Sequence, residues 1–380
     1  MILPGAKIGI LGGGQLGRML ILAGRPLGYH FHVLCPDQNS TAGSIADSFI
    51  RANYDDVNAL MRFANSVDCI TFEFENIPSE TLSLLSNQKP IYPNANVLHV
   101  CQHRQREKDF LKAEKFPCAP FEYASDANSL IHAIKKIGYP CVIKTAAFGY
   151  DGKGQIKIES SMDISDPQGI WNQLGSPERV VIEEWIIHKG EYSVVCARNA
   201  EGLMSTFPVA ENVHINHILH SSNVPAPIKD SISDEANRLA KQIAERLDVV
   251  GLIAIEFFLN QEDRLIINEM APRPHNSGHY TMDACITSQF QQHIRAITGL
   301  PFGETSIHTP CVMLNILGDL WKKSEPNWAK LLSDPSVQLH LYDKGEARKG
   351  RKMGHFNVLN KNLLKAKERA KILFLELKGQ

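Results

Sequence analysis

The stretch GLIAIEFFLNQEDRLIINEM, residues 251–270, consists of two apolar runs separated by the polar segment NQED. Both runs are rich in Ile, Leu and Phe, and each has the length of a strand rather than of a helix. The pattern therefore predicts an antiparallel hairpin of strands 251–259 and 264–270, with NQED as its turn.

Two glutamates interrupt these apolar runs, and their placement predicts a cation site. A four-residue turn sets Glu256 opposite Ile267, with Glu269 two residues further along the same face, so the carboxylates are diagonal cross-strand neighbours. A register slip of one residue would put them on opposite faces. Like charges so placed are destabilising unless a cation lies between them. Mg²⁺ takes one or two carboxylates together with substrate phosphates, so the pair indicates a nucleotide site. The alternative, two solvent-exposed glutamates, is weakened by the apolar residues that flank them in both strands.

A glycine-rich segment, AFGYDGKGQ (residues 147–155), lies between the predicted strands 141–146 and 155–159. A Walker A loop must end in Gly-Lys-Ser/Thr and open a helix, and this segment does neither. It is predicted to be a hairpin flap whose backbone N–H groups can cover a triphosphate, with Lys144 placed to pair with phosphate charge. The alternative is an ordinary flexible hairpin.

Length and composition limit the class of protein. A chain of 380 residues predicts two or three domains, and 43% hydrophobic with 21% charged residues is typical of a globular protein. The formal net charge of -1 gives no electrostatic reason to expect nucleic acid or a membrane as partner. The sequence shows neither a membrane-spanning run nor an apolar signal core, and its cysteines are scattered singly, so we expect a cytoplasmic protein with reduced thiols.

Strand and helix patterns differ between the two ends of the chain. The first third alternates strands with helices, which predicts a parallel sheet covered by helices; its elements are strands 7–11, 31–35 and 69–74 and helices 15–27, 56–64 and 103–114. The middle third has strands joined by short turns, which predicts an antiparallel sheet; its elements are strands 141–146, 155–159, 180–185 and 191–197 and the amphipathic helix 233–247. A strand at 311–317 and a basic helix at 362–378 follow.

The segment GGGQLGR, residues 12–18, has the glycine spacing of a dinucleotide-binding turn, and Asp37 follows at the distance of a ribose-binding acid. This pattern raises the alternative of an NAD-dependent dehydrogenase. That reading leaves the second glycine-rich segment and the glutamate pair unexplained.

Two further segments are candidates for binding a substrate. The irregular loop APRPHNSGHY, residues 271–280, follows Glu269 directly and presents several hydrogen-bond donors. Five basic residues crowd positions 344–352 among glycines, which indicates an anion site, with a solvated basic loop as the alternative. The histidine spacings at 214–220 lack the companion ligands of a zinc site, and the sequence has no Gly-x-Ser-x-Gly nucleophile motif.

Together the flap, the glutamate pair and the segment Glu183-Glu184-Trp185-Ile186 resemble the ATP-grasp superfamily. Five motifs along the whole chain are similar to those of the N5-carboxyaminoimidazole ribonucleotide synthase family of purine biosynthesis. They are GGGQLGR (12–18), FEFENIP (72–78), GYDGKGQ (149–155), APRPHNSGH (271–279) and RKMGH (351–355).

The resemblance implies a multidomain α/β and α+β protein with an ATP-grasp fold. It implies a Rossmann-like pre-ATP-grasp domain with a parallel sheet over residues 1–100 and an ATP-grasp domain over 101–299, whose lobes are about 101–186 and 187–299. A small β-rich C-terminal domain with a terminal helix would cover 300–380. A homodimer is also implied.

It further implies the residues of an ATP site between the lobes, namely Arg104, Lys144, Gly149, Tyr150, Asp151, Gly152, Lys153, Gly154, Gln155, Glu183, Glu184, Trp185, Ile186, Glu191, His214, Asn268 and Glu269. Arg104 and Lys144 would lie near phosphates, and Glu191 would hold the ribose. Glu256 and Glu269 would bind Mg²⁺, with Mn²⁺ as an alternative ion.

The implied reaction is the ATP-dependent carboxylation of 5-aminoimidazole ribonucleotide by bicarbonate, through carboxyphosphate, by a carbon–nitrogen ligase. Asp151, Lys153 and Arg273 would be catalytic. The ribonucleotide would be bound by Gln15, Leu16, Glu73, Tyr150, His275, Asn276, Lys344, Arg351 and Lys352. Two alternatives are another ATP-grasp ligase, such as the formate-dependent glycinamide ribonucleotide transformylase, and a non-catalytic nucleotide sensor.

Overall fold

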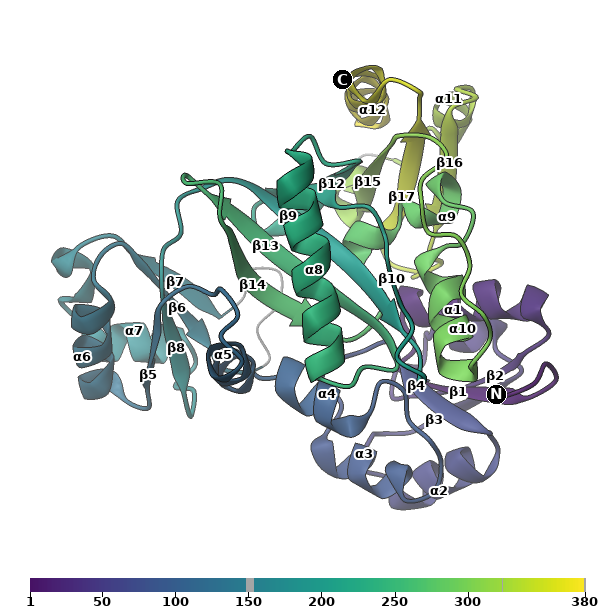
Figure 1. Ribbon diagram of the computed structural model, residues 1–380, viewed down its shortest axis with the longest axis horizontal. Helices are drawn as coiled ribbons and strands as arrows, with labels where there is room; N and C mark the ends of the chain where they lie inside the picture. The colour runs from purple at the N-terminus through teal and green to yellow at the C-terminus, as the bar shows by residue number, and fades with distance from the viewer. Residues whose placement is uncertain (148–153, 323, 379–380) are drawn as a thin grey trace.

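The computed structural model describes residues 1–147, 154–322 and 324–378, and in this part of the chain the strands form three sheets (Figure 1). A small sheet lies in the N-terminal region, a second forms a lobe at one end of the molecule, and a large one runs through the centre. None of the described helices combines the length and the apolar character needed to cross a bilayer.

The N-terminal sheet is parallel, as predicted from the alternation of strands and helices. Its strands in spatial order are β3 (Ser48–Arg51), β2 (His30–Cys35), β1 (Lys7–Leu11) and β4 (Cys69–Phe72). The helical segments of this region are α1 (Gln15–Gly24), η1 (Arg25–Leu27), η2 (Gly43–Ile45), α2 (Val57–Asn65), α3 (Ser79–Ser86) and α4 (Ala95–Cys101). Because these strands are parallel, the carboxyl ends of β1, β2 and β4 lie at one edge of the sheet, which is the edge where a parallel sheet usually binds its ligand.

The lobe at the end of the molecule contains an antiparallel sheet, again as predicted. Its strands in spatial order are β5 (Phe121–Ala124), β8 (Val180–Glu184), β6 (Cys141–Thr145) and β7 (Gln155–Ile158). One face is covered by α6 (Ala127–Ile137), α7 (Pro167–Gln173) and the short turn η3 (Ser161–Ile164). The Asp126 side chain accepts a hydrogen bond from the Ser129 amide and so caps the first turn of α6. Helix α5 (Arg104–Ala113) leads into this lobe.

The large sheet joins the middle of the chain to its C-terminal region. Its strands in spatial order are β14 (Leu265–Ala271), β13 (Gly251–Asn260), β9 (His188–Arg198), β11 (Ala210–Ile215), β12 (Ile218–Val224), β15 (Cys311–Leu317), β17 (Lys352–Leu359) and β16 (Val337–Leu341), and β10 (Met204–Thr206) also pairs with β9. Because β12 pairs with β15, a single hydrogen-bonded sheet runs from the glutamate-bearing hairpin to the strand that carries Lys352.

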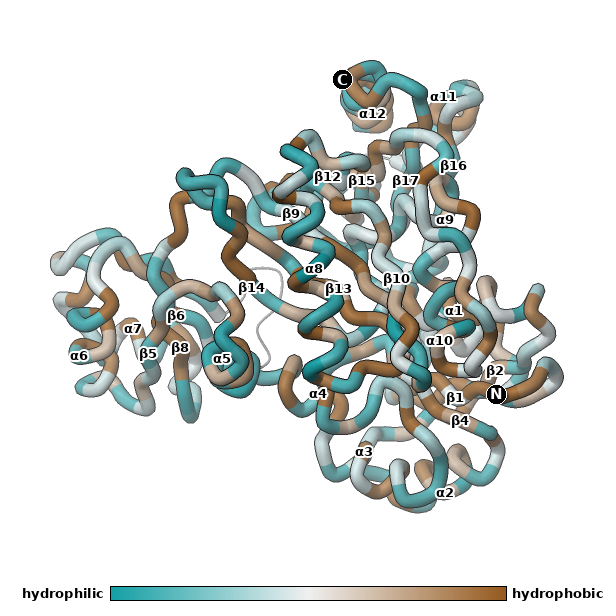
Figure 2. Tube along the Cα trace, in the orientation of Figure 1, coloured by the Kyte–Doolittle hydropathy of each residue, from teal (hydrophilic) through white to brown (hydrophobic). Residues whose placement is uncertain are grey.

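Helices cover this sheet and connect it to the N-terminal region. Helix α8 (Asp230–Arg246) packs its apolar side on β9, β13 and β14, and its outward side is hydrophilic (Figure 2). Helix α10 (Gln289–Thr298) packs on α1, and together they bury Phe290 and Ile294 against Leu20. The remaining helical segments are η4 (Asn276–Gly278), α9 (Thr281–Ala284), η5 (Gly318–Lys322), α11 (Trp328–Leu332) and α12 (Leu363–Leu377).

The predicted hairpin of β13 and β14 is confirmed, but its predicted register is wrong. The turn is one residue longer than assumed: the Asn260 amide donates to the Arg264 carbonyl at 3.0 Å, and Asp263 takes a left-handed φ of 59°. This change alone would move the two carboxylates to opposite faces. A bulge at Asn268 inserts one extra residue into β14 and restores the facing, so that Glu256 pairs directly with Glu269 and not diagonally.

Candidate active site

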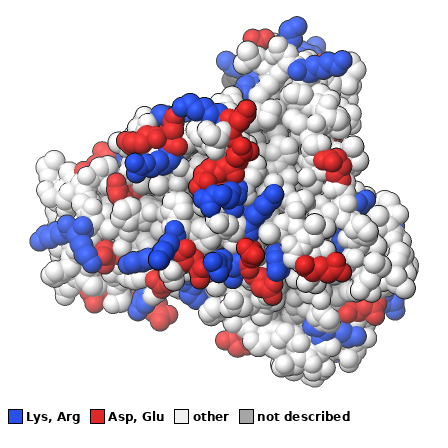
Figure 3. All heavy atoms as spheres, in the orientation of Figure 1, with Lys and Arg blue, Asp and Glu red and all other residues white. Residues whose placement is uncertain are grey.

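A cavity of about 740 Å³ lies where the three sheets approach one another. Its wall includes the turn after β1, the ends of β2 and β4, the adjacent strands β6 and β8, and the strands β9, β13 and β14. On the face of the molecule shown in Figure 3, acidic and basic side chains alternate and neither sign forms an unbroken field. The cavity wall itself carries both signs, with glutamates such as Glu256 and Glu269 and cations such as Lys144 and Arg273, which suits a ligand with both anionic and polar groups.

Most of the predicted site residues that the structure describes line this cavity. They are Gln15, Leu16, Glu73, Arg104, Lys144, Gln155, Glu183, Glu184, Trp185, Ile186, Glu191, His214, Glu256, Asn268, Glu269, Arg273, His275, Asn276 and Lys352. Gly154, Lys344 and Arg351 are described but are not part of the wall. The predictions for Gly149, Tyr150, Asp151, Gly152 and Lys153 fall outside the described residues.

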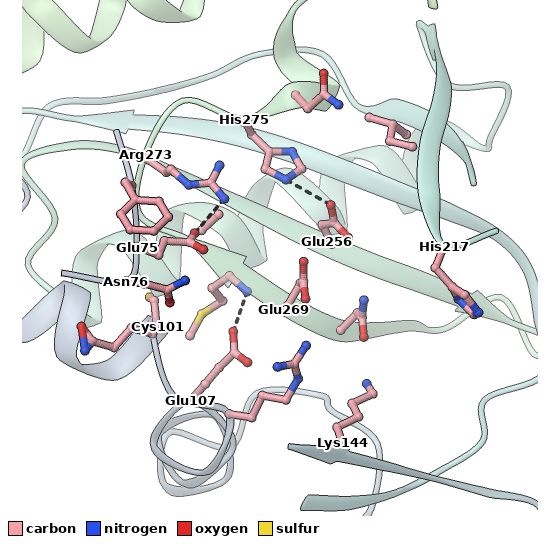
Figure 4. A pocket seen from close by; sticks show the side chains of 18 of the residues that line it. Glu75, Asn76, Cys101, Glu107, Lys144, His217, Glu256, Glu269, Arg273 and His275 are labelled. Carbon is pink, nitrogen blue, oxygen red and sulfur yellow. Dashed lines mark hydrogen bonds and ion pairs between the residues drawn. The ribbon is translucent and has the colours of Figure 1, made fainter. Parts of the chain in front are cut away.

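Glu183 links two lysines on the lobe side of the cavity. Its Oε1 lies 3.1 Å from Lys144 Nζ, and its Oε2 lies 3.0 Å from Lys108 Nζ. Burial by itself would raise the pKa of Glu183, but the two ammonium groups lower that pKa to about 2. Burial also lowers the pKa of Lys144. Glu183 therefore stays ionised and holds the Lys144 ammonium at the cavity wall (Figure 4).

Glu256 and Glu269 face each other from β13 and β14 across the cavity from Lys144 (Figure 4). Burial, with repulsion from Glu269, raises the pKa of Glu256 to about 8. Within the described ranges no group of three or more His, Cys, Asp and Glu side chains has the geometry of a metal site. A carboxylate pair in the wall of this cavity fits Mg²⁺, which completes its shell with phosphate and water oxygens.

A chain of buried hydrogen bonds orients His275 toward Glu256. The Ser277 amide donates to His275 Nδ1 at 3.4 Å, and the Ser277 hydroxyl lies 2.8 Å from the same nitrogen. Asn212 Nδ2 donates to Ser193 Oγ, and that hydroxyl donates in turn to Ser277 Oγ. The Ser277 hydroxyl is left to donate to Nδ1, so the ring proton lies on Nε2, 3.2 Å from Glu256 Oε1. Burial keeps the pKa of His275 well below its usual value, which favours this neutral form.

The first glycine-rich turn packs against a side chain of the protein itself. Glu73 Oε1 accepts from the Gly14 amide at 2.7 Å, and a Cβ added at Gly12 would lie 2.7 Å from Glu73 Cγ. Gly12 also has φ of +108°, which disfavours any other residue. Burial raises the pKa of Glu73, although Lys344 and the amide of Gly14 act in the opposite direction. Asp37 lies in the same part of the wall.

Several cavity residues could not be assigned from the sequence. Glu75 pairs with Arg273 at 3.0 Å, and burial raises its pKa (Figure 4). Glu75 is the exception, because it belongs to the FEFENIP motif and could have been assigned from it. Further wall residues that were not assigned include Cys101, Glu107, His188, His217 and Phe258, and also Asn76, which belongs to the same motif. Outside that motif the local sequence gives no signal, because such side chains more often serve packing or the surface.

Polar and aromatic groups form the wall opposite the glycine turn. His214 Nδ1 lies 2.8 Å from Glu191 Oε2, and this contact raises the pKa of His214 although burial alone would lower it. The rings of His188 and Phe258 stack with centroids 4.7 Å apart. Both residues line the cavity, and an aromatic surface of this kind suits contact with a planar heterocycle.

Comparison with known proteins agrees with this geometry. Residues 5–102 match the ribonucleotide synthetase preATP-grasp domain, residues 109–290 the ATP-grasp domain, and residues 311–369 the phosphoribosylaminoimidazole carboxylase C-terminal domain. N5-carboxyaminoimidazole ribonucleotide synthase of Bacillus subtilis strain 168 is 41% identical over 359 residues, which cover 94% of this chain and 93% of that protein. A bifunctional purine synthesis protein of Dictyostelium discoideum is 39% identical, and the alignment covers 93% of this chain and 37% of that longer protein.

Solved structures share the fold over the full chain. The ADP complex of an N5-carboxyaminoimidazole ribonucleotide synthetase has a TM-score of 0.92 and 42% identity, covering 100% of this chain and 99% of that one. N5-carboxyaminoimidazole synthase from Aspergillus clavatus, in complex with ADP and 5-aminoimidazole ribonucleotide, has a TM-score of 0.89 and 29% identity, covering 99% of both chains.

The fold and the cavity thus define an ATP-grasp enzyme, an ATP-dependent ligase with an N-terminal parallel sheet and a β-rich C-terminal region. Within that class, the chain belongs to the N5-carboxyaminoimidazole ribonucleotide synthase family of purine biosynthesis.

The ion pairs of Glu183 predict that the free energy of unfolding depends on pH. Glu183→Gln should cost about 3–5 kcal/mol at neutral pH, because it leaves two buried ammonium groups without their carboxylate. The native pKa of about 2 is below that of the unfolded chain, so this stabilisation is complete above the unfolded pKa of about 4.3 and is lost as pH falls toward 2.

Urea unfolding of both proteins between pH 7 and pH 3 measures this difference. The difference in free energy of unfolding between wild type and Glu183→Gln should become smaller below about pH 4. Glu184→Gln, a change at the exposed neighbouring residue, is the matched control and should remain near wild-type stability. A gap that stays constant down to pH 3 would contradict the account.

Proposed function

We propose that this enzyme uses ATP to activate bicarbonate and transfers the carboxylate to the exocyclic amine of 5-aminoimidazole ribonucleotide. The observation that carries the proposal is the arrangement of one cavity: a facing carboxylate pair, a lysine on the opposite wall, and a glycine turn of a parallel sheet at the far end. The first two features suit a triphosphate. The third suits the ribonucleotide.

The nucleotide would lie between β6, β8 and the glutamate hairpin. Trp185 and Ile186 would border the adenine, beside the stacked rings of His188 and Phe258. Glu191, oriented by His214, would accept hydrogen bonds from the ribose hydroxyls. Lys144 and Arg104 would contact the phosphates, where Lys144 stabilises negative charge on the equatorial oxygens.

Glu256 and Glu269 would hold Mg²⁺, with Asn268 adjacent and with Mn²⁺ as an alternative ion. When bound, the ion would offset the charge of the β- and γ-phosphates. His275 would keep Glu256 in place by donating its Nε2 proton to that carboxylate.

Bicarbonate is a poor electrophile, so the reaction needs an activated intermediate. A bicarbonate oxygen attacks the γ-phosphorus of ATP, the bond from that phosphorus to ADP breaks, and carboxyphosphate forms. The exocyclic amine then takes the carboxyl carbon, phosphate leaves, and the amine gives up a proton. Because carboxyphosphate decomposes in water, exclusion of water from the loaded site would favour transfer over hydrolysis.

The ribonucleotide would lie at the glycine turn. Gln15, Leu16 and Glu73 would contact it from the N-terminal sheet, and Arg273, His275 and Asn276 would approach from the loop after β14. Lys352 would pair with its phosphate, with Lys344 and Arg351 nearby on the same C-terminal segment. The roles of Tyr150, Asp151 and Lys153 as flap residues that contact substrate or move its proton rest on the family resemblance.

We propose the domain division 1–100, 101–299 and 300–380, which the three family matches support. We also propose a homodimer in the cytoplasm, which the family resemblance implies. Sedimentation velocity measures the dimer directly.

The competing function is carboxylate activation for another ribonucleotide, such as formate with glycinamide ribonucleotide. ADP release separates the two. Bicarbonate with 5-aminoimidazole ribonucleotide should stimulate ADP release, and formate with glycinamide ribonucleotide should leave it at the level of ATP alone. Stimulation by the second mixture only would overturn the proposed substrate pair.

The metal role predicts the effect of Glu269→Gln. This variant should lose about 100-fold or more in the rate of ATP turnover while its unfolding transition remains, because a neutral amide is a weaker magnesium ligand than a carboxylate. Steady-state ADP release measures the rate, and circular dichroism follows the unfolding.

Glu262→Gln is the matched control for this variant, since Glu262 lies exposed in the turn of the same hairpin. It should turn over ATP at the wild-type rate. Near-normal turnover in Glu269→Gln would remove Glu269 from the metal site.

A further inference from the structure

Strand β14 is the edge strand of the large sheet, and its outward backbone groups need partners. Two consecutive residues of α5 supply them on either side of Glu269. Lys108 Nζ donates to the Asn268 carbonyl at 3.1 Å, and Glu107 Oε1 accepts from the Met270 amide at 2.6 Å. The backbone at the bulge is therefore held from outside the hairpin.

Both α5 side chains are almost fully buried, with exposed fractions of 3% for Glu107 and 1% for Lys108. Charged residues are rarely buried without partners, so each must be compensated by the groups it contacts. Lys108 does not line the cavity, whereas Glu107 does (Figure 4). A lysine this deep and outside the ligand space acts on the site through the groups that it binds.

Those groups connect the two sides of the nucleotide site. Lys108 contacts the bulge through the Asn268 carbonyl and contacts Glu183, which in turn holds Lys144. A single ammonium group thus ties the strand of the carboxylate pair to the strand of the phosphate-facing lysine.

We propose that Glu107 and Lys108 are positioning residues that fix the bulge at Asn268 and couple the facing of Glu256 and Glu269 to the position of Lys144. The inference rests on the proposed nucleotide site but not on the identity of the second substrate. It assigns control over how tightly the enzyme binds a magnesium nucleotide to two residues of α5, one helical turn after Arg104.

An ordinary core ion pair is the competing explanation, and it predicts different measurements. Loss of a purely structural contact reduces the amount of folded protein and leaves the affinity of the folded fraction unchanged. Loss of a positioning contact changes the affinity for magnesium nucleotide in protein that remains folded.

The test is calorimetric titration of MgADP into Lys108→Met, with Lys112→Met as the matched control. Lys112 lies one turn further along α5 and is exposed. Lys108→Met should weaken MgADP binding about tenfold or more, and it should raise the KM for MgATP while the KM for 5-aminoimidazole ribonucleotide changes less than about twofold. Lys112→Met should bind MgADP as wild type does.

A second pair of variants tests the proposal if Lys108→Met does not fold. Glu107→Gln keeps an oxygen that can accept from the Met270 amide, and Glu107→Leu does not. Glu107→Gln should bind MgADP about tenfold or more tightly than Glu107→Leu. Equal affinities in this pair, or wild-type MgADP affinity in folded Lys108→Met, would overturn the proposal. Because MgADP binding needs no second substrate, these results are independent of the ADP-release assay.

Discussion

The facing of two carboxylates on adjacent strands is the constraint on which the site depends. Glu256 and Glu269 pair directly in the hairpin of β13 and β14, where repulsion and burial favour protonation of one of them. A divalent cation reverses this preference, because it is attracted to both charges at once. Two like charges thus lie side by side in this hairpin, and its surroundings hold the backbone beside them in place.

Those surroundings come from segments far apart in the sequence. The outer edge of β14 is held by α5, which precedes the hairpin by more than a hundred residues, and Glu183 on β8 orders Lys144 across the cavity. The large sheet continues through β12 and β15, so the strand that carries Lys352 belongs to the same hydrogen-bonded framework as the carboxylate pair. One rigid sheet can therefore set the distance between a nucleotide and a ribonucleotide, which a transfer reaction requires.

Much of the fold could be predicted from periodicity, since strands and helices of both halves follow the apolar pattern closely. The register of the hairpin could not be predicted. It depends on the left-handed conformation of Asp263 and on a bulge at Asn268. Each of them shifts the pairing by one residue, so the two shifts together leave both glutamates on the predicted face. Glu107 and Lys108 were missed because charges on a helix usually face solvent. The glycines at 12–14 were identified by their spacing as a dinucleotide-binding turn, but at Gly12 and Gly14 the close neighbour is the protein's own Glu73, which the sequence pattern alone does not reveal.

The most direct test of the central claim is a crystal structure with ADP and Mn²⁺, read from the anomalous scattering of the manganese. We expect an anomalous peak between the side chains of Glu256 and Glu269, about 2.0–2.3 Å from an oxygen of each and in contact with an ADP phosphate. A peak bound to ADP but beyond ligand distance of both glutamates would contradict the account.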